Sequence, residues 1–224
     1  MAGISPGGDY AELLARAVAA VIAGDQALAE GELAPIAGLT GKPAQSERLP
    51  TLSFSGWPTA THPPTRNPPK RDLARVFARD SYTCVYCGRR TVFPGVLRLL
   101  SRLFPTAFPL QANWKLAETH RAYWDIATSV DHICPVSRGG DWQEVENLAT
   151  ACYRCQDQKS NRRLSELGWE LRRPPPTGWV GLTRRYQELW TVMGQPSGDH
   201  RAWIRCLGES GESGGAAIPA GFSP

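Results

Sequence analysis

The chain has 224 residues, a formal net charge of +4 and 42% hydrophobic residues. This length suits one domain with tails or with a helical appendage, and the hydrophobic fraction is sufficient for a core. The mild positive charge permits nucleic-acid binding but does not by itself indicate it. The most apolar early run covers only residues 17–23, which is too short to span a bilayer, so we expect no membrane association.

The first unit in chain order is an N-terminal helical segment over residues 1–30, in which residues 10–30 are predicted to form an amphipathic helix. No basic stretch precedes its apolar run, so it does not resemble a signal peptide, and we expect a cytoplasmic protein. This helix can either dock on the rest of the chain or form a homodimer. In a reducing compartment, paired cysteines are more often metal ligands than disulfides.

The 22 glycines and 19 prolines of the chain gather in a few stretches. They predict a linker over residues 31–69 and a disordered tail over residues 208–224. Residues 70–207 then form the folded domain, and residues 91–128 are predicted to be an insertion that loops away from the rest.

The domain is expected to contain both helices and short strands, which makes its fold class α+β. In chain order, the pattern predicts a basic helix over 72–79, an apolar segment over 92–103, a helix over 118–127, a strand over 130–136, a return strand over 147–150, helical structure over 152–164 and a last helix over 183–193. A turn at Gly139 and Gly140 separates the two strands.

Four of the six cysteines form two Cys-x-x-Cys pairs. The pairs are Cys84 with Cys87 and Cys152 with Cys155. Each pair can supply two thiolates from one tight turn, and two such turns complete the tetrahedron that zinc prefers. A redox role is the alternative, but redox motifs rarely occur twice in one small domain. The remaining cysteines, Cys134 and Cys206, are expected to be ordinary thiols.

A series of short motifs lies between and around the cysteine pairs. In order they are Asp131-His132-Ile133-Cys134-Pro135, Gly139-Gly140, Asn147-Leu148, the second cysteine pair and Lys159. With the first pair, this order resembles the HNH endonuclease family of the bacterial and phage type, over about residues 80–165. The resemblance implies a zinc-braced ββα-metal core of treble-clef-like type, with helical additions. It also implies an endonuclease that cuts DNA by direct attack of water on phosphorus.

The resemblance assigns a role to each matched residue. His132 would be the general base, and Asp131 would bind a catalytic Mg²⁺ or Mn²⁺. Asn147 would hold the loop or orient the imidazole, while Lys159 would point at the substrate phosphate. The usual Asn or His after the last cysteine is Gln156 here, whose longer side chain shifts the reach of its carbonyl. Asp157 or Asn161 can substitute for it as ligand.

Basic residues around the motifs suit a phosphate-backbone contact, although a solvated helix face gives the same pattern. The candidate nucleic-acid-binding residues are Arg138, Arg154, Arg162 and Arg163. By contrast, His120 is expected to pack in the core. The sequence thus predicts a metal-dependent DNA endonuclease containing structural zinc. The alternatives are a non-catalytic zinc module that binds nucleic acid and a protein-interaction module on a zinc scaffold.

Overall fold

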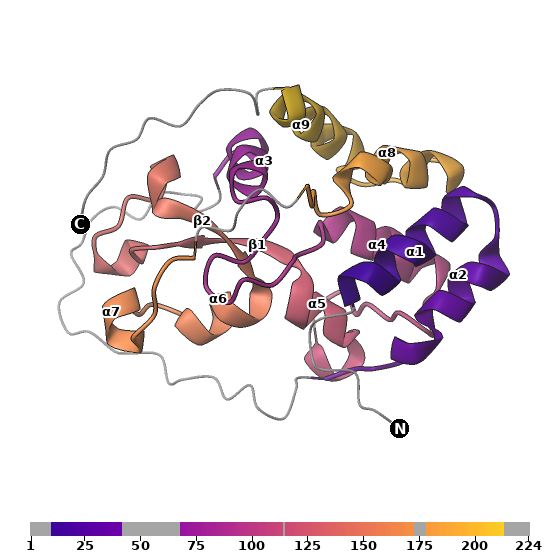
Figure 1. Cartoon of the computed structure of the whole chain (residues 1–224), viewed down its shortest axis with the longest axis horizontal. Coiled ribbons are helices and arrows are strands. Elements are labelled where there is room, and N and C mark those ends of the chain that lie inside the picture. Colours follow the sequence, from indigo (N-terminus) through magenta and orange to yellow (C-terminus); the bar gives the residue numbers. More distant parts are fainter. Residues whose placement is uncertain (1–9, 42–67, 114, 173–177, 213–224) are drawn as a thin grey trace.

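The structure is a computed structural model that describes residues 10–41, 68–113, 115–172 and 178–212 (Figure 1). It contains helices and one two-stranded antiparallel sheet, which confirms the predicted α+β class. Across the described ranges, no helix is long and apolar enough to cross a membrane.

Two helices occupy the region where the sequence predicts one. Helix α1 spans Tyr10–Ile22 and helix α2 spans Gln26–Leu33, and they lie side by side in Figure 1. The chain turns at Gly24, whose φ of 79° is in the left-handed region, and Asp25 caps α2 by accepting from Leu28 N at 2.9 Å. Both features end the first helix and start a second, so the prediction of one continuous helix is wrong.

The start of the predicted linker belongs to the folded structure. A 3-10 turn, η1, spans Ala34–Ile36, and the Ile36 side chain is only 1% exposed. Residues 42–67, which include most of that linker, lie outside the described residues.

The segment predicted as an insertion packs into the molecule rather than looping away. It contains helix α4 (Pro94–Leu103), the turn η2 (Leu116–Glu118) and helix α5 (Arg121–Ile126). Its two ends meet in a parallel bridge between Val92 and Ala127. The expectation of a peripheral insertion is therefore wrong, because the apolar faces of α4 and α5 supply much of the core.

The sheet and the helix after it form a ββα unit. Strand β1 (Thr128–His132) pairs with strand β2 (Leu148–Cys152), with His132 opposite Leu148. Helix α6 (Tyr153–Lys159) begins at the residue that follows β2. The connection between the strands contains two 3-10 turns, η3 (Val136–Arg138) and η4 (Val145–Asn147).

The remaining helices frame this unit. Helix α3 (Lys70–Arg79) precedes the first cysteine pair, and the short helix α7 (Leu164–Leu167) follows α6. Helix α8 (Thr183–Val192) matches the last predicted helix, while α9 (His200–Glu212) was not predicted and lies beside α3 (Figure 1). Because α9 runs to Glu212, the predicted disordered tail begins at least five residues too early. Residues 213–224 lie outside the described residues.

Buried side chains form a large and a small cluster. The large cluster joins α1, α2, α4, α5 and α8 and includes Leu14, Leu33, Leu100, Tyr123 and Leu189. The small one consists of Cys84, Val85, Tyr86, Ala149, Ala151, Cys152 and Cys155, so it surrounds the cysteines. Such a small apolar cluster supplies little stability by itself. A metal bound by the cysteines would stabilise this sheet end of the molecule.

Candidate active site and metal centre

The four paired cysteines come together between the first cysteine turn and the end of the sheet. Their sulfur atoms all lie within 4.8 Å of one another, and Sγ of Cys87 lies 3.9 Å from Sγ of Cys152. Ligands at the usual Zn–S length of about 2.3 Å in a tetrahedron are about 3.8 Å apart, and a disulfide is only about 2.05 Å long. The cluster therefore suits a structural metal such as zinc.

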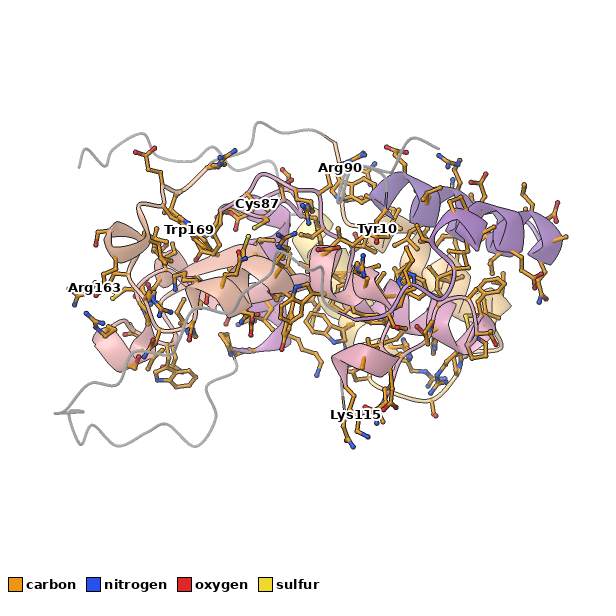
Figure 2. The ribbon with its side chains drawn as sticks, turned by 90° about the horizontal axis from the view of Figure 1, so that it is seen from below. Tyr10, Cys87, Arg90, Lys115, Arg163 and Trp169 are labelled. Carbon is orange, nitrogen blue, oxygen red and sulfur yellow. The ribbon has the colours of Figure 1, made fainter. Side chains whose placement is uncertain are left out.

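Local backbone geometry presents the first cysteine pair. Gly88 has a φ of 75°, and its N–H donates to the carbonyl of Cys84 at 2.8 Å. This left-handed residue lets the chain fold back beneath both sulfurs. Figure 2 shows Cys87 and Trp169 at this end of the molecule, away from Tyr10 on α1.

An ion-pair network links the two cysteine turns. Asp125 on α5 is fully buried, and its Oδ1 lies 3.5 Å from Arg89 Nη1 and 3.6 Å from Arg154 Nη1. Arg89 follows the first cysteine pair and Arg154 lies inside the second. Burial raises the pKa of the Asp125 carboxyl, and both arginines oppose that effect. One carboxylate from the segment predicted as an insertion thus holds both turns.

Asp131 and His132 line one cleft between β1 and α6. This β1–α6 cleft has a volume of about 310 Å³, and Gln156 and Asn161 also line it. Neighbouring residues of a strand point to opposite sides, but His132 ends β1, so both can reach the cleft.

Tyr86 contacts Asp131 from the first cysteine turn. Its hydroxyl donates to Asp131 Oδ2 at 2.6 Å. Burial, more than the nearby Asp131 charge, raises the pKa of Tyr86, so the hydroxyl keeps the proton that it donates. The sequence analysis missed this residue; its position between Cys84 and Cys87 was the available signal.

The His132 ring is held at one nitrogen. Nε2 lies 3.2 Å from the carbonyl oxygen of Trp142. Because a carbonyl only accepts, Nε2 must donate, and the neutral ring then carries its lone pair at Nδ1. A ring in this tautomer can accept a proton from a water molecule.

Asn147 braces the connection between the strands. Its Oδ1 accepts from Cys134 N at 2.8 Å, and its Nδ2 donates to the carbonyls of Cys134 at 3.0 Å and Asp141 at 2.7 Å. Gly140 lies so close to these hydrogen-bonded groups that an added Cβ would be 1.9 Å from the Cys134 carbonyl oxygen. Of the two roles considered for Asn147, the contacts favour holding the loop that carries the Trp142 carbonyl.

Comparison with known proteins agrees with this geometry. Residues 122–162 match the family model described as HNH endonuclease. This segment is an HNH domain. It extends from α5 through the sheet to just beyond α6, and it indicates a nuclease or nucleic-acid-binding function. No curated protein and no solved structure matches the chain.

Within the HNH domain, Lys159 does not take the orientation expected from the sequence. Its side chain is fully buried, and Nζ lies 2.7 Å from the carbonyl oxygen of His132 and 3.0 Å from Asp131 Oδ2. Lys159 is four residues after Cys155, so both lie on the inner face of α6. The ammonium therefore supports Asp131 and the end of β1 instead of facing a substrate phosphate.

The Asp131 carboxyl is consequently surrounded by donors. Burial raises its pKa above the ordinary value, while Lys159 and then Tyr86 act in the opposite direction. Both contacts engage Oδ2. The carboxylate still has its second oxygen, Oδ1, to offer to a cation.

Gln156 presents its amide in one defined orientation. Nε2 donates to the Val130 carbonyl at 2.7 Å, so Oε1 is directed away from that strand. Of the two residues considered as substitutes, Asn161 lines the β1–α6 cleft, whereas Asp157 is not part of its lining. Asp131, Gln156 and Asn161 thus bring carboxylate and amide oxygens, which hard cations prefer, to the lining of this cleft.

The four candidate nucleic-acid-binding arginines are largely engaged within the protein. Arg138 Nη2 lies 3.0 Å from Glu166 Oε1, and Arg163 Nη2 donates to the Arg138 carbonyl at 3.3 Å. Arg154 pairs with buried Asp125, and Arg162 is 7% exposed. Arg163 is the exposed member of the set, and Figure 2 shows it at the left end of the molecule, far from Tyr10.

His120 has a structural role. Nε2 lies 2.7 Å from the Ile36 carbonyl oxygen, and Nδ1 accepts from Ala122 N at 3.1 Å, which caps α5. Burial lowers the pKa of His120 to about 4. This neutral, buried ring agrees with the expectation of core packing.

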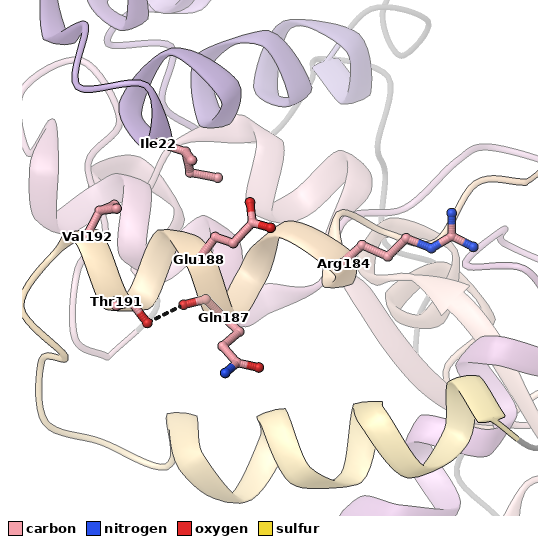
Figure 3. A pocket seen from close by; sticks show the side chains of 6 residues that line it. All are labelled: Ile22, Arg184, Gln187, Glu188, Thr191 and Val192. Carbon is pink, nitrogen blue, oxygen red and sulfur yellow. Dashed lines mark hydrogen bonds between the residues drawn. The ribbon is translucent and has the colours of Figure 1, made fainter.

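A hollow between α1 and α8 differs in its lining from the β1–α6 cleft. It measures about 440 Å³ and is lined by Ile22, Arg184, Gln187, Glu188, Thr191 and Val192 (Figure 3). Its lining includes neither a histidine nor a cysteine, and Thr191 Oγ1 bonds within its own helix to the Gln187 carbonyl at 2.9 Å. The β1–α6 cleft is therefore the stronger candidate.

Proposed function

We propose that the chain is a metal-dependent endonuclease that hydrolyses DNA phosphodiester bonds, with His132 as general base. The observation that carries this proposal is the Nε2 contact to the Trp142 carbonyl, which leaves Nδ1 as acceptor on a ring lining the β1–α6 cleft. Adjacent Asp131 and Gln156 provide oxygen atoms of the type that Mg²⁺ and Mn²⁺ prefer. The HNH match supports the same class of reaction.

Each residue then has a defined task. His132 takes a proton from the attacking water, and the Trp142 carbonyl keeps the ring in the required tautomer. Asp131 and Gln156 would hold the divalent cation, which when bound offsets the charge of the phosphoryl group.

Lys159 and Tyr86 position Asp131, and Asn147 positions the loop carrying Trp142. The four cysteines would hold zinc, which fixes the relative placement of Tyr86 and α6.

Cleavage of supercoiled plasmid by the native protein and by His132→Ala tests this proposal. We expect nicking or linearisation with Mg²⁺ or Mn²⁺, none with EDTA, and a rate at least about 100-fold lower in the variant. Excess Mg²⁺ added after brief EDTA treatment should restore cleavage if the catalytic cation was removed and zinc was not.

Two results would contradict the proposal. Normal cutting by folded His132→Ala would exclude this residue as the base. Absence of cleavage by the folded, zinc-loaded native protein with either cation, together with retained DNA binding, would favour the non-catalytic zinc module.

A further inference from the structure

A second hollow lies beside the β1–α6 cleft along the same strand. It measures about 500 Å³ and is lined by α3, α4, α8, α9 and the start of β1, and these helices lie above and to the right of β1 in Figure 1. We call it the α3–α9 hollow. Val130 lines both this hollow and the β1–α6 cleft. From Thr128 in the hollow to His132 in the cleft, four residues of strand span about 13 Å.

Positive charge predominates at the rim of the α3–α9 hollow. Lys70, Arg98 and Arg102 line it, against the single acidic residue Asp199. Asp199 is already occupied, because its Oδ2 lies 3.4 Å from Lys70 Nζ and accepts from Trp203 Nε1 at 3.1 Å.

The two arginines are arranged as a pair. Arg98 and Arg102 are exposed and lie four residues apart on α4, so they share one face of the helix. Arg102 Nη2 reaches the Ser197 carbonyl at 3.4 Å, next to the turn that leads into α9. Guanidinium groups placed in this way suit bidentate contacts to phosphate oxygens.

Aromatic rings form the interior of the hollow. Phe93 packs edge-on against Tyr186 and against Trp203, with ring centroids 5.1 Å apart in each pair. Tyr186 Oη lies 2.6 Å from His200 Nδ1. Because Phe93 and Tyr186 are at most 2% exposed, these rings form the rigid floor of the hollow, and the cationic rim above them is the part that suits backbone phosphates.

We propose that the α3–α9 hollow binds backbone phosphates of the DNA strand beside the cleavage position, through Arg98 and Arg102. This inference rests on the proposed nuclease function. The distance of about 13 Å along β1 corresponds to about four nucleotide steps of duplex at 3.4 Å each. A substrate reacting at His132 would therefore reach the hollow with its flank.

Binding of a fluorescein-labelled DNA duplex, several helical turns long, tests the inference by fluorescence anisotropy over a series of salt concentrations. The buffer contains no added Mg²⁺ or Mn²⁺, so that the duplex stays intact, and no chelator, so that bound zinc is retained. We expect R98Q/R102Q to bind several-fold more weakly and to reduce the slope of log affinity against log salt by about 1.8, which is about 0.9 for each phosphate contact. R98K/R102K should retain the native slope.

R184Q/R185Q is the matched control, because it removes the same charge from two exposed arginines on α8 outside the hollow. Its slope should equal that of the native protein. Equal slopes for R98Q/R102Q and the control, with intact plasmid cleavage by the native protein, would overturn this inference alone. A reduced slope without any plasmid cleavage would reject the nuclease and the position beside a cleavage site, and would leave the hollow as a DNA-binding site of a non-catalytic module. Failure of the native protein both to bind and to cleave DNA would overturn both.

Discussion

At the residue scale, the centre of the site is the carboxyl of Asp131. Tyr86 at 2.6 Å and Lys159 at 3.0 Å share its Oδ2, and they come from the first cysteine turn and from α6. The first cysteine turn and α6 also supply cysteines to the metal cluster. The orientation of a proposed cation ligand thus depends on the metal centre through two direct contacts.

Tyr86→Phe removes one of these contacts and keeps the ring. Loss of a hydrogen bond to a carboxylate should cost about 1.5–3 kcal/mol of stability. We expect the cleavage rate to fall about ten-fold, which corresponds to about 1.4 kcal/mol. The Mg²⁺ concentration for half-maximal rate should rise, because Asp131 is less firmly oriented.

Tyr123→Phe is the matched control, since Tyr123 Oη bonds to Ser101 Oγ at 2.9 Å in the helical core. It should lose about 0.5–1.5 kcal/mol of stability and leave the Mg²⁺ dependence unchanged. An identical Mg²⁺ titration for Tyr86→Phe and this control would show that Tyr86 only stabilises the fold.

The free energy of unfolding should depend on pH in part through the buried His120 ring. Its pKa is about 4 in the folded protein and about 6.5 when unfolded, so between these values the unfolded chain binds more protons. Its contribution to folding is present above pH 6.5 and is lost as the pH falls towards 4, by about 3 kcal/mol in total. Denaturant unfolding of the native protein and of His120→Gln at several pH values measures it. The difference between them should be constant above pH 7 and shrink below pH 6.

At the element scale, α5 connects the helical core to the HNH domain. Asp125 is fully buried on this helix and faces an arginine from each cysteine turn. The Val92–Ala127 bridge ties the two ends of the α4–α5 segment to the start of β1. This segment is therefore a support for the metal centre.

Asp125→Asn removes the charge shared by the two arginines. Each arginine side chain is 20% exposed, so solvent weakens the effect, and we expect a loss of about 2–3 kcal/mol. Zinc should also transfer faster to a competing chelator.

Asp72→Asn on α3 is the control. It removes a surface ion pair with Arg75 at 3.6 Å and should cost less than about 1 kcal/mol. Equal losses for both variants, measured by thermal unfolding, would contradict the bracing role.

At the scale of the whole molecule, stability is divided between a large helical core and a small cysteine-centred one. Structural zinc contributes on the order of 10 kcal/mol of apparent binding energy in small sites. Cys84→Ser should therefore lower the zinc content and the melting temperature markedly. Cys206→Ser on α9, outside the cluster, should retain zinc as measured by metal analysis. An unchanged melting temperature for Cys84→Ser would reject the structural-metal assignment.

The sequence predicted local features of this molecule better than long-range ones. Some features depend only on residues that are close together in the sequence, and these were predictable: the cysteine pairs, the Gly-Gly turn and the ββα order. The burial of Lys159 depends on which face of α6 meets β1, and the pairing of Arg154 depends on Asp125 from a distant helix. The contact partner of such a side chain depends on tertiary packing, so it cannot be predicted from spacing along the chain. The second hollow was unpredictable for the same reason, because α3, α4 and α9 meet only in the fold.

The junction of Val92 with Ala127 also bears on the order in which we expect the chain to fold. The four sulfurs can meet only after the long segment 88–151 has closed on itself, and closing a loop costs entropy that grows with its length. Contacts of α4 and α5 with the helical core can offset that cost without an ion. We therefore expect capture of the ion to be a late step of folding rather than its nucleus, so that the refolding rate of the helical core should be independent of the zinc concentration.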